Sequence, residues 1–167
     1  MKKPFSLFSL SLFTFYILLL FTSCSQEEKR VLVFSKTAEF RHGSIEAGQV
    51  ALIKMGLENN IKVDTTENAS FFNEENLMQY SAVVFLNTTG DVLDYAQQAD
   101  FERYIQAGGG YVGIHAATDT EYDWKWYNKL VGAYFNGHPN IQAAKLNILE
   151  KNHPATKGIN DPWIKTD

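Results

Sequence analysis

The chain has 167 residues, of which 45% are hydrophobic and 20% are charged, and its formal net charge is −4 at pH 7. A mildly acidic chain without a basic stripe argues against nucleic-acid binding, so we expect no nucleic-acid partner. The single cysteine, Cys24, excludes an intramolecular disulfide and leaves no thiol nucleophile in the domain that follows it.

Residues 1–23 have the pattern of a lipoprotein signal peptide, because two lysines precede an apolar run over 5–21 that ends at small polar residues. A spanning helix needs about 20 apolar residues, which favours cleavage before Cys24 over the alternative of an uncleaved anchor. We therefore expect Cys24 to carry lipid, residues 24–29 to form a polar tether, and the membrane to be a partner. The expected location is the bacterial cell envelope, and 30–167 is long enough for one domain.

The first half of the domain alternates strand and helix signals. An almost continuous apolar run over 30–35 predicts a strand buried on both faces of a sheet. Ser44 is a candidate cap for the helix that follows, and 61–65 is a second strand. A short helix opens at 73–75, and 82–87 is a third strand of the buried type.

The second half continues the alternation. Asp94 is expected to cap a helix that Gly108 ends. A fourth strand is predicted at 111–114, a helix at 124–131 and a fifth strand at 141–149. Strands separated by helices imply right-handed crossovers. We therefore expect an α/β fold, a flavodoxin-like three-layer sandwich around a mostly parallel sheet.

This fold predicts where a ligand binds. In open parallel sheets the site lies beyond the carboxyl ends of the strands. The segments to inspect are therefore 35–43, 87–91 and 115–123. The glycine pattern at 108, 110 and 113 is no dinucleotide site, since it ends a helix and enters a strand instead of the reverse.

His115 follows the fourth predicted strand, where related folds place the nucleophile of a strand-turn-helix elbow. An amidotransferase needs a cysteine thiolate at that position, so glutamine hydrolysis by that mechanism is excluded. Two interpretations of His115 stay open, a buried hydrogen-bonded histidine and a functional one, and its position favours function.

The segment after His115 is rich in carboxylates and aromatic rings. If the loop is extended, Asp119, Glu121 and Asp123 share one side and can act as general acid or base. Trp124 and its aromatic neighbours could form a platform for a sugar ring, although packing against the sheet is the commoner role of such residues.

Three histidines lie close to the ends of predicted strands, one after the first strand, one after the fourth and one before the fifth. His42, His115 and His138 could hold a divalent metal if they converge, but a hydrogen-bonding or acid/base role is equally consistent with their spacing. Arg41 lies just before a predicted helix and could bind an anionic or carbonyl-bearing ligand.

Several separated motifs, in order, resemble the ThuA-like family from Val31 to Trp163. They are Val33–Lys36 with Phe40–His42, Thr89–Asp91, Gly108–Asp119, Trp126–Tyr127, Leu130–Ala133 and Gly137–Pro139. The resemblance implies a class I glutamine amidotransferase-like fold without that chemistry, and a role in the use of trehalose or related, including oxidised, sugars. Such domains usually continue further, so it also implies a C-terminally truncated chain.

The resulting assignment gives His115 and Asp119 catalytic roles. Sugar contacts are assigned to Arg41, His42, Thr89, Glu121, Trp124 and His138. An enzyme of this kind would be a carbohydrate-active hydrolase, lyase or isomerase. The alternatives are a non-catalytic sugar-binding lipoprotein and a metal-dependent hydrolase built on the histidines.

Overall fold

The computed structural model describes residues 29–166. The expected signal peptide, Cys24 and all of the tether except Lys29 lie outside the described residues. Within the described part of the chain, none of the helices is both long and apolar enough to cross a membrane.

Four parallel strands form the central sheet. They are β1 (Arg30–Phe34), β2 (Lys62–Thr66), β3 (Ala82–Leu86) and β4 (Gly110–Ile114), and their order across the sheet is β2-β1-β3-β4. The registers pair Leu32 with Val83 and Phe85 with Gly113, so the carboxyl ends of β1, β3 and β4 meet at one edge. The predicted mostly parallel α/β architecture is confirmed.

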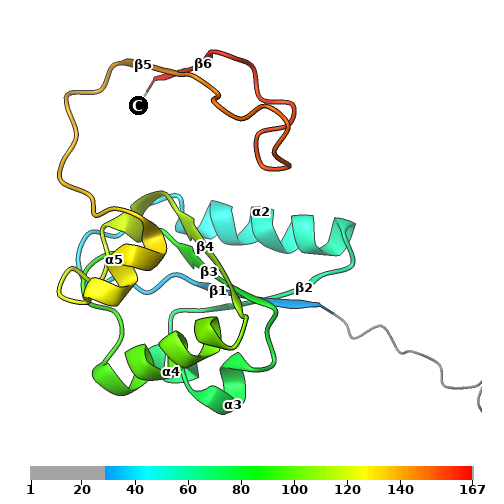
Figure 1. Cartoon of the computed structure of the whole chain (residues 1–167), viewed down its shortest axis with the longest axis vertical. Coiled ribbons are helices and arrows are strands. Elements are labelled where there is room, and N and C mark those ends of the chain that lie inside the picture. The colour runs from blue at the N-terminus through cyan, green and yellow to red at the C-terminus, as the bar shows by residue number, and fades with distance from the viewer. Residues whose placement is uncertain (1–28, 167) are drawn as a thin grey trace, which may run out of the picture.

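Helices cover both faces of this sheet, as Figure 1 shows. One face carries α2 (Ile45–Glu58), and the other carries α3 (Glu74–Leu77) and α4 (Tyr95–Gln106). The remaining elements are the 3₁₀ turns η1 (Ala69–Phe71) and η2 (His115–Thr118) and the helix α5 (Lys125–Val131). The three predicted layers are therefore present.

The ends of α4 follow from its sequence. The Asp94 carboxylate accepts from the Gln97 amide at 2.9 Å, and the Gln97 side chain accepts from the Asp94 amide, which completes a capping box. At the other end Gly108 has φ 102° and its amide bonds to the Ile105 carbonyl, which is the left-handed stop that was expected. The glycine pattern thus ends a helix and enters β4, as predicted.

The two faces of the sheet are packed to different degrees. On the α4 face Phe34, Phe72, Phe85 and Phe101 are essentially buried and contact one another. On the α2 face the buried residues are fewer, and Val112 of β4 is 48% exposed. The edge strand β4 is therefore open on the face that α2 covers elsewhere.

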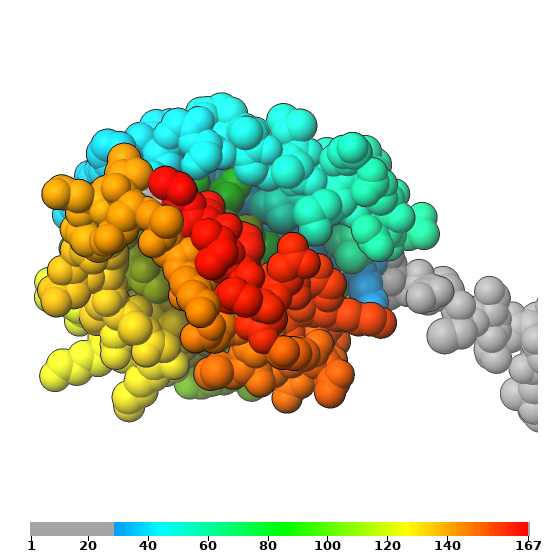
Figure 2. All heavy atoms as spheres, turned by 90° about the horizontal axis from the view of Figure 1, so that it is seen from above, coloured from blue at the N-terminus to red at the C-terminus, as the bar shows by residue number. Residues whose placement is uncertain are grey.

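The predicted fifth strand is present but belongs to another sheet. The strand β5 (Ala143–Leu146) pairs antiparallel with β6 (Trp163–Thr166), and every residue of both strands is exposed. Its sequence, with two alanines and Lys145, has too little apolar surface to be buried on both faces like β3. Figures 1 and 2 show this C-terminal segment, orange to red, as a separate layer across the body of the molecule.

Candidate functional site

Three loops meet beyond the carboxyl ends of β1, β3 and β4. The Ala38 amide donates to the Thr89 carbonyl at 2.8 Å, and the Gly90 amide donates to the Asp119 carbonyl at 2.8 Å. These bonds join the loop after β3 to the loops on both sides of it. The predicted segments therefore form one continuous surface, which we call the carboxyl edge.

His115 occupies a sharp elbow between β4 and η2. Its backbone has φ 53°, in the left-handed region that few residues other than glycine adopt, and its side chain is exposed. Residues held in such conformations cluster at binding and catalytic sites. The strand-elbow-helix geometry predicted for this position is present, with an imidazole where a nucleophile would project.

His42 and His115 lie against each other across the carboxyl edge. Their ring centroids are 4.7 Å apart and nearly perpendicular, at 78°. Burial, and then the positive charge that His115 can carry, lower the pKa of His42, while the nearby Asp119 carboxylate raises it. His42 is therefore biased toward its neutral form, which can accept a proton.

Asp119 supplies a carboxylate beside the two rings. The Tyr122 hydroxyl donates to its Oδ1 at 2.5 Å and also lies 2.9 Å from the Phe135 carbonyl. Burial first, and this hydrogen bond second, raise the pKa of Tyr122 to about 12, so the phenol stays protonated. The arrangement keeps one Asp119 oxygen oriented while the side chain remains partly accessible.

Glu121 is only two residues further on but is turned into the protein. Its side chain is 1% exposed; Oε1 accepts from the amides of Val92 and Leu93 at 2.8 Å, and Oε2 accepts from Gln98 at 2.6 Å. The carboxylates at 119, 121 and 123 do not share one side as expected, because Glu121 has φ 55° and the loop is not extended. Burial raises the pKa of Glu121 despite the three donors.

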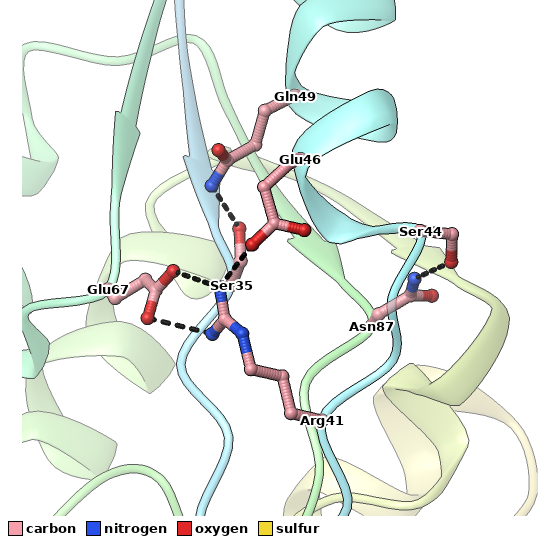
Figure 3. A network of polar contacts seen from close by, with 7 residues as sticks. All are labelled: Ser35, Arg41, Ser44, Glu46, Gln49, Glu67 and Asn87. Carbon is pink, nitrogen blue, oxygen red and sulfur yellow. Dashed lines mark hydrogen bonds and ion pairs between the residues drawn. The ribbon is translucent and has the colours of Figure 1, made fainter.

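Arg41 is held by two carboxylates of the chain itself. Its guanidinium lies 2.8 Å from Glu46 and 2.9 Å from Glu67, as Figure 3 shows. These carboxylates raise the pKa of Arg41. Arg41 ties the loop after β1 to α2 and to the end of β2, so its charge is compensated within the protein.

Thr89 and Trp124 also make internal contacts. The buried Thr89 hydroxyl donates to the Phe40 carbonyl at 2.8 Å. Trp124 stacks on Trp126 and Tyr127 and packs against the α4-side core, so the packing interpretation of these aromatic residues holds for most of their surface. Together with Glu121, Trp124 lines a hollow of about 440 Å³ next to the start of α4.

His138 does not join the other two histidines as a metal-binding group. Its Nδ1 lies 2.9 Å from the Pro139 carbonyl, its ring is 6.0 Å from that of Phe135, and the residue is exposed. Among residues 29–166 there is no group of three or more His, Cys, Asp or Glu side chains that could hold a metal ion. Five candidate residues thus fall into two groups, His42 with His115 and Asp119, and Glu121 with Trp124 at the hollow, whereas Arg41, Thr89 and His138 belong to neither.

Asn87 and Ser44 are polar residues of the carboxyl edge that were not predicted as site residues. The Asn87 amide nitrogen donates to the Ser44 hydroxyl at 2.9 Å (Figure 3). Ser44 stands at the predicted start of α2, but its side chain caps no amide of that helix in the described structure. An asparagine directly after a buried strand, at a position that favours left-handed backbone, was the available signal in the sequence.

A parallel sheet covered on both faces, with a histidine at the elbow after β4, defines an α/β protein of the flavodoxin-like class whose elbow lacks an amidotransferase cysteine. The family model described as "ThuA: Trehalose utilisation" matches residues 30–167. The chain therefore belongs to the ThuA family.

Solved structures with this fold include two ThuA-like proteins. One, from Bacteroides uniformis, has 24% identity and a TM-score of 0.69, with 87% of this chain and 61% of that chain covered. The other, from Parabacteroides merdae, has 19% identity and a TM-score of 0.60, with 81% and 60% covered. This chain thus spans about three fifths of their length, and no curated protein matches it.

Proposed function

We propose that the carboxyl edge binds a sugar of the trehalose type and that His42, His115 and Asp119 act on it. The observation that carries this proposal is the contact between the His42 and His115 rings at an elbow with left-handed backbone. Membership of a family described by trehalose utilisation supports a carbohydrate ligand. Because this chain spans about three fifths of the length of the two solved ThuA-like proteins, the activity of the whole protein is itself part of the proposal.

The chemistry we propose is proton transfer. His42 has a lowered pKa and is therefore available as a base near neutral pH, while the exposed His115 can hold or donate a proton on the ligand side. Asp119 would orient the imidazoles or stabilise a positive charge that forms there. These roles suit a hydrolase, lyase or isomerase.

The test compares wild type with His115→Ala and Asp119→Asn in the full chain. Each protein is titrated calorimetrically with trehalose, sucrose, maltose and lactose, and the sugars are then analysed for chemical change by chromatography. We expect wild type to bind at least one sugar and both variants to bind it at least about tenfold more weakly. His153→Ala is the control, since His153 lies in an exposed turn and accepts a bond from Ala155.

Unchanged affinity and unchanged turnover in both variants would remove the proposal. Binding that depends on His115 without any chemical change after long incubation would instead support a non-catalytic sugar-binding role at the same site. These two outcomes are distinguished by the same pair of measurements.

We also propose that the protein is anchored in the bacterial cell envelope through lipid on Cys24. The lysine-led apolar segment before that cysteine supports this proposal. In cells fed a labelled fatty acid, wild type should be labelled and found with membranes. A Cys24→Ser protein that is labelled and fractionates like wild type would contradict it.

A further inference from the structure

The Asn87 side chain is buried at the carboxyl edge. The residue directly follows β3 and is 3% exposed. Its amide nitrogen donates to Ser44, but its Oδ1 has no hydrogen-bond partner among the described residues. A buried polar atom without a hydrogen bond is energetically unfavourable, and a ligand that supplies the bond removes this cost.

The backbone holds Asn87 next to the histidine elbow. Asn87 has φ 52° and His115 has φ 53°, so adjacent strands both end in left-handed residues. The backbone amide of Asn87 donates to the Ile114 carbonyl at 3.2 Å, and this bond fixes the two strand ends side by side. Asparagine tolerates this conformation better than most residues, so the position suits an amide side chain.

Ser44 orients the Asn87 amide group. Because the Ser44 hydroxyl accepts from Nδ2, the direction of Oδ1 is set by a bond within the protein (Figure 3). Ser44 and His115, which belong to the segments on either side of Asn87, are both exposed. Asn87 is therefore buried between two exposed residues of the carboxyl edge.

The charges around this edge disfavour an anionic ligand. The Lys36 ammonium group donates to the Val92 carbonyl at 2.8 Å, and Arg41 is paired with Glu46 and Glu67. The Asp119 carboxylate lies close enough to affect the pKa of His42. Arg41 is thus paired with two carboxylates, the Lys36 ammonium group is held by a backbone carbonyl, and the Asp119 carboxylate remains at the site, an arrangement that does not favour a phosphate or carboxylate on the ligand.

We infer that Asn87 Oδ1 accepts a hydrogen bond from a hydroxyl group of an uncharged sugar that lies against His42 and His115. This inference rests on the proposed function and assigns it a specificity-determining residue. The bound hydroxyl satisfies an acceptor that has no partner within residues 29–166, so the bond favours ligands that place a hydroxyl there and disfavours those that lack one.

The test uses the full chain with Asn87→Gly, which keeps the backbone conformation and removes the amide. Asn60→Gly is the matched control, because Asn60 also has left-handed backbone, φ 55°, and is exposed after α2. Calorimetric titration with the neutral disaccharide panel, and with trehalose 6-phosphate, measures affinity. We expect Asn87→Gly to bind about tenfold more weakly and Asn60→Gly to bind like wild type.

Asn87→Asp supplies the conservative rescue. It tolerates the same backbone and keeps an acceptor oxygen, so we expect it to retain most of the wild-type affinity for the neutral sugar. If Asn87→Gly does not unfold cooperatively, Asn87→Ser takes its place in the titrations, because the serine side chain is too short to replace the amide.

The outcomes separate this inference from the proposed function. Wild-type affinity in Asn87→Gly, together with weakened binding in His115→Ala, would overturn the role of Asn87 and leave the proposed function standing. Tighter binding of trehalose 6-phosphate than of trehalose would overturn the uncharged ligand class. Wild type that binds no sugar of the panel would overturn the proposed function and this inference with it.

Discussion

Asp119 and Glu121 are two residues apart and have the same charged group, yet their surroundings differ. Glu121 is 1% exposed and receives three hydrogen bonds from the loop and helix after β3. Asp119 is partly exposed, receives one from Tyr122 and lies beside the histidine pair. One carboxylate therefore holds the loops together, whereas the other remains available to a ligand.

The largest effect is expected when Glu121 is truncated. Glu121→Ala leaves the Val92 and Leu93 amides without their acceptor, and we expect the free energy of unfolding to fall by about 3 kcal/mol. Urea denaturation followed by circular dichroism measures this loss. Glu102→Ala, in which a partly exposed carboxylate on α4 is removed, is the control and should change stability by less than about 0.5 kcal/mol.

Truncation of Asp119 should give the opposite profile. Asp119→Ala removes one partly exposed hydrogen bond, and the Tyr122 hydroxyl keeps the Phe135 carbonyl as an acceptor. We expect a stability loss of no more than about 1 kcal/mol and a fall of about tenfold or more in sugar affinity. A large stability loss with unchanged affinity would show that the two carboxylates do not differ as described.

The pH dependence of stability tests the Glu121 environment. Burial raises its pKa above the ordinary value of 4.5, so the folded state binds the proton more tightly than the unfolded state does. The Glu121 contribution to stability should therefore be lost as pH rises from about 4.5 through the raised pKa. Denaturation of wild type and Glu121→Gln across this range should show a pH-dependent difference; parallel curves would contradict the assignment.

The smallest expected effect concerns His42. Its pKa in the folded protein lies below the ordinary value of 6.5. At pH values between the lowered pKa and 6.5 the unfolded state binds more protons than the folded state, so the free energy of unfolding should decrease as pH falls below 6.5. His42→Gln should remove this part of the acid-side loss. The comparison of thermal unfolding at pH 7.5 and pH 5.5 measures it, with His153→Gln as the control.

The sheet, its helices and the edge where the candidate loops meet were predictable because buried apolar runs such as 82–86 and cap residues such as Asp94 encode local structure directly. The difference between Asp119 and Glu121 was not predictable. It depends on left-handed backbone at Glu121 and on amides from a different loop, neither of which follows from spacing. The sheet to which β5 belongs also depends on its distant partner, β6.

The contacts of Asn87 at the carboxyl edge were also not predictable from the sequence. The position of Asn87 directly after a buried strand predicts a polar residue at the carboxyl edge. The spacing does not predict that its side-chain nitrogen donates to Ser44, 43 positions earlier, while Oδ1 has no partner among the described residues. Ser44 was expected to cap α2, a local role, and the tertiary contact replaced that role. Local patterns therefore predicted where the candidate loops meet, while tertiary contacts determine which of their side chains are exposed at the carboxyl edge.

The most direct test of the His42–His115 site uses the imidazole signals in NMR spectra. The chain has four histidines, so each signal can be assigned by single substitution. During titration with the neutral disaccharide panel, we expect the His42 and His115 signals to shift along one saturation curve for a bound sugar, while the His153 signal stays constant. A sugar that binds and leaves both the His42 and His115 signals unchanged would contradict a site built on this pair.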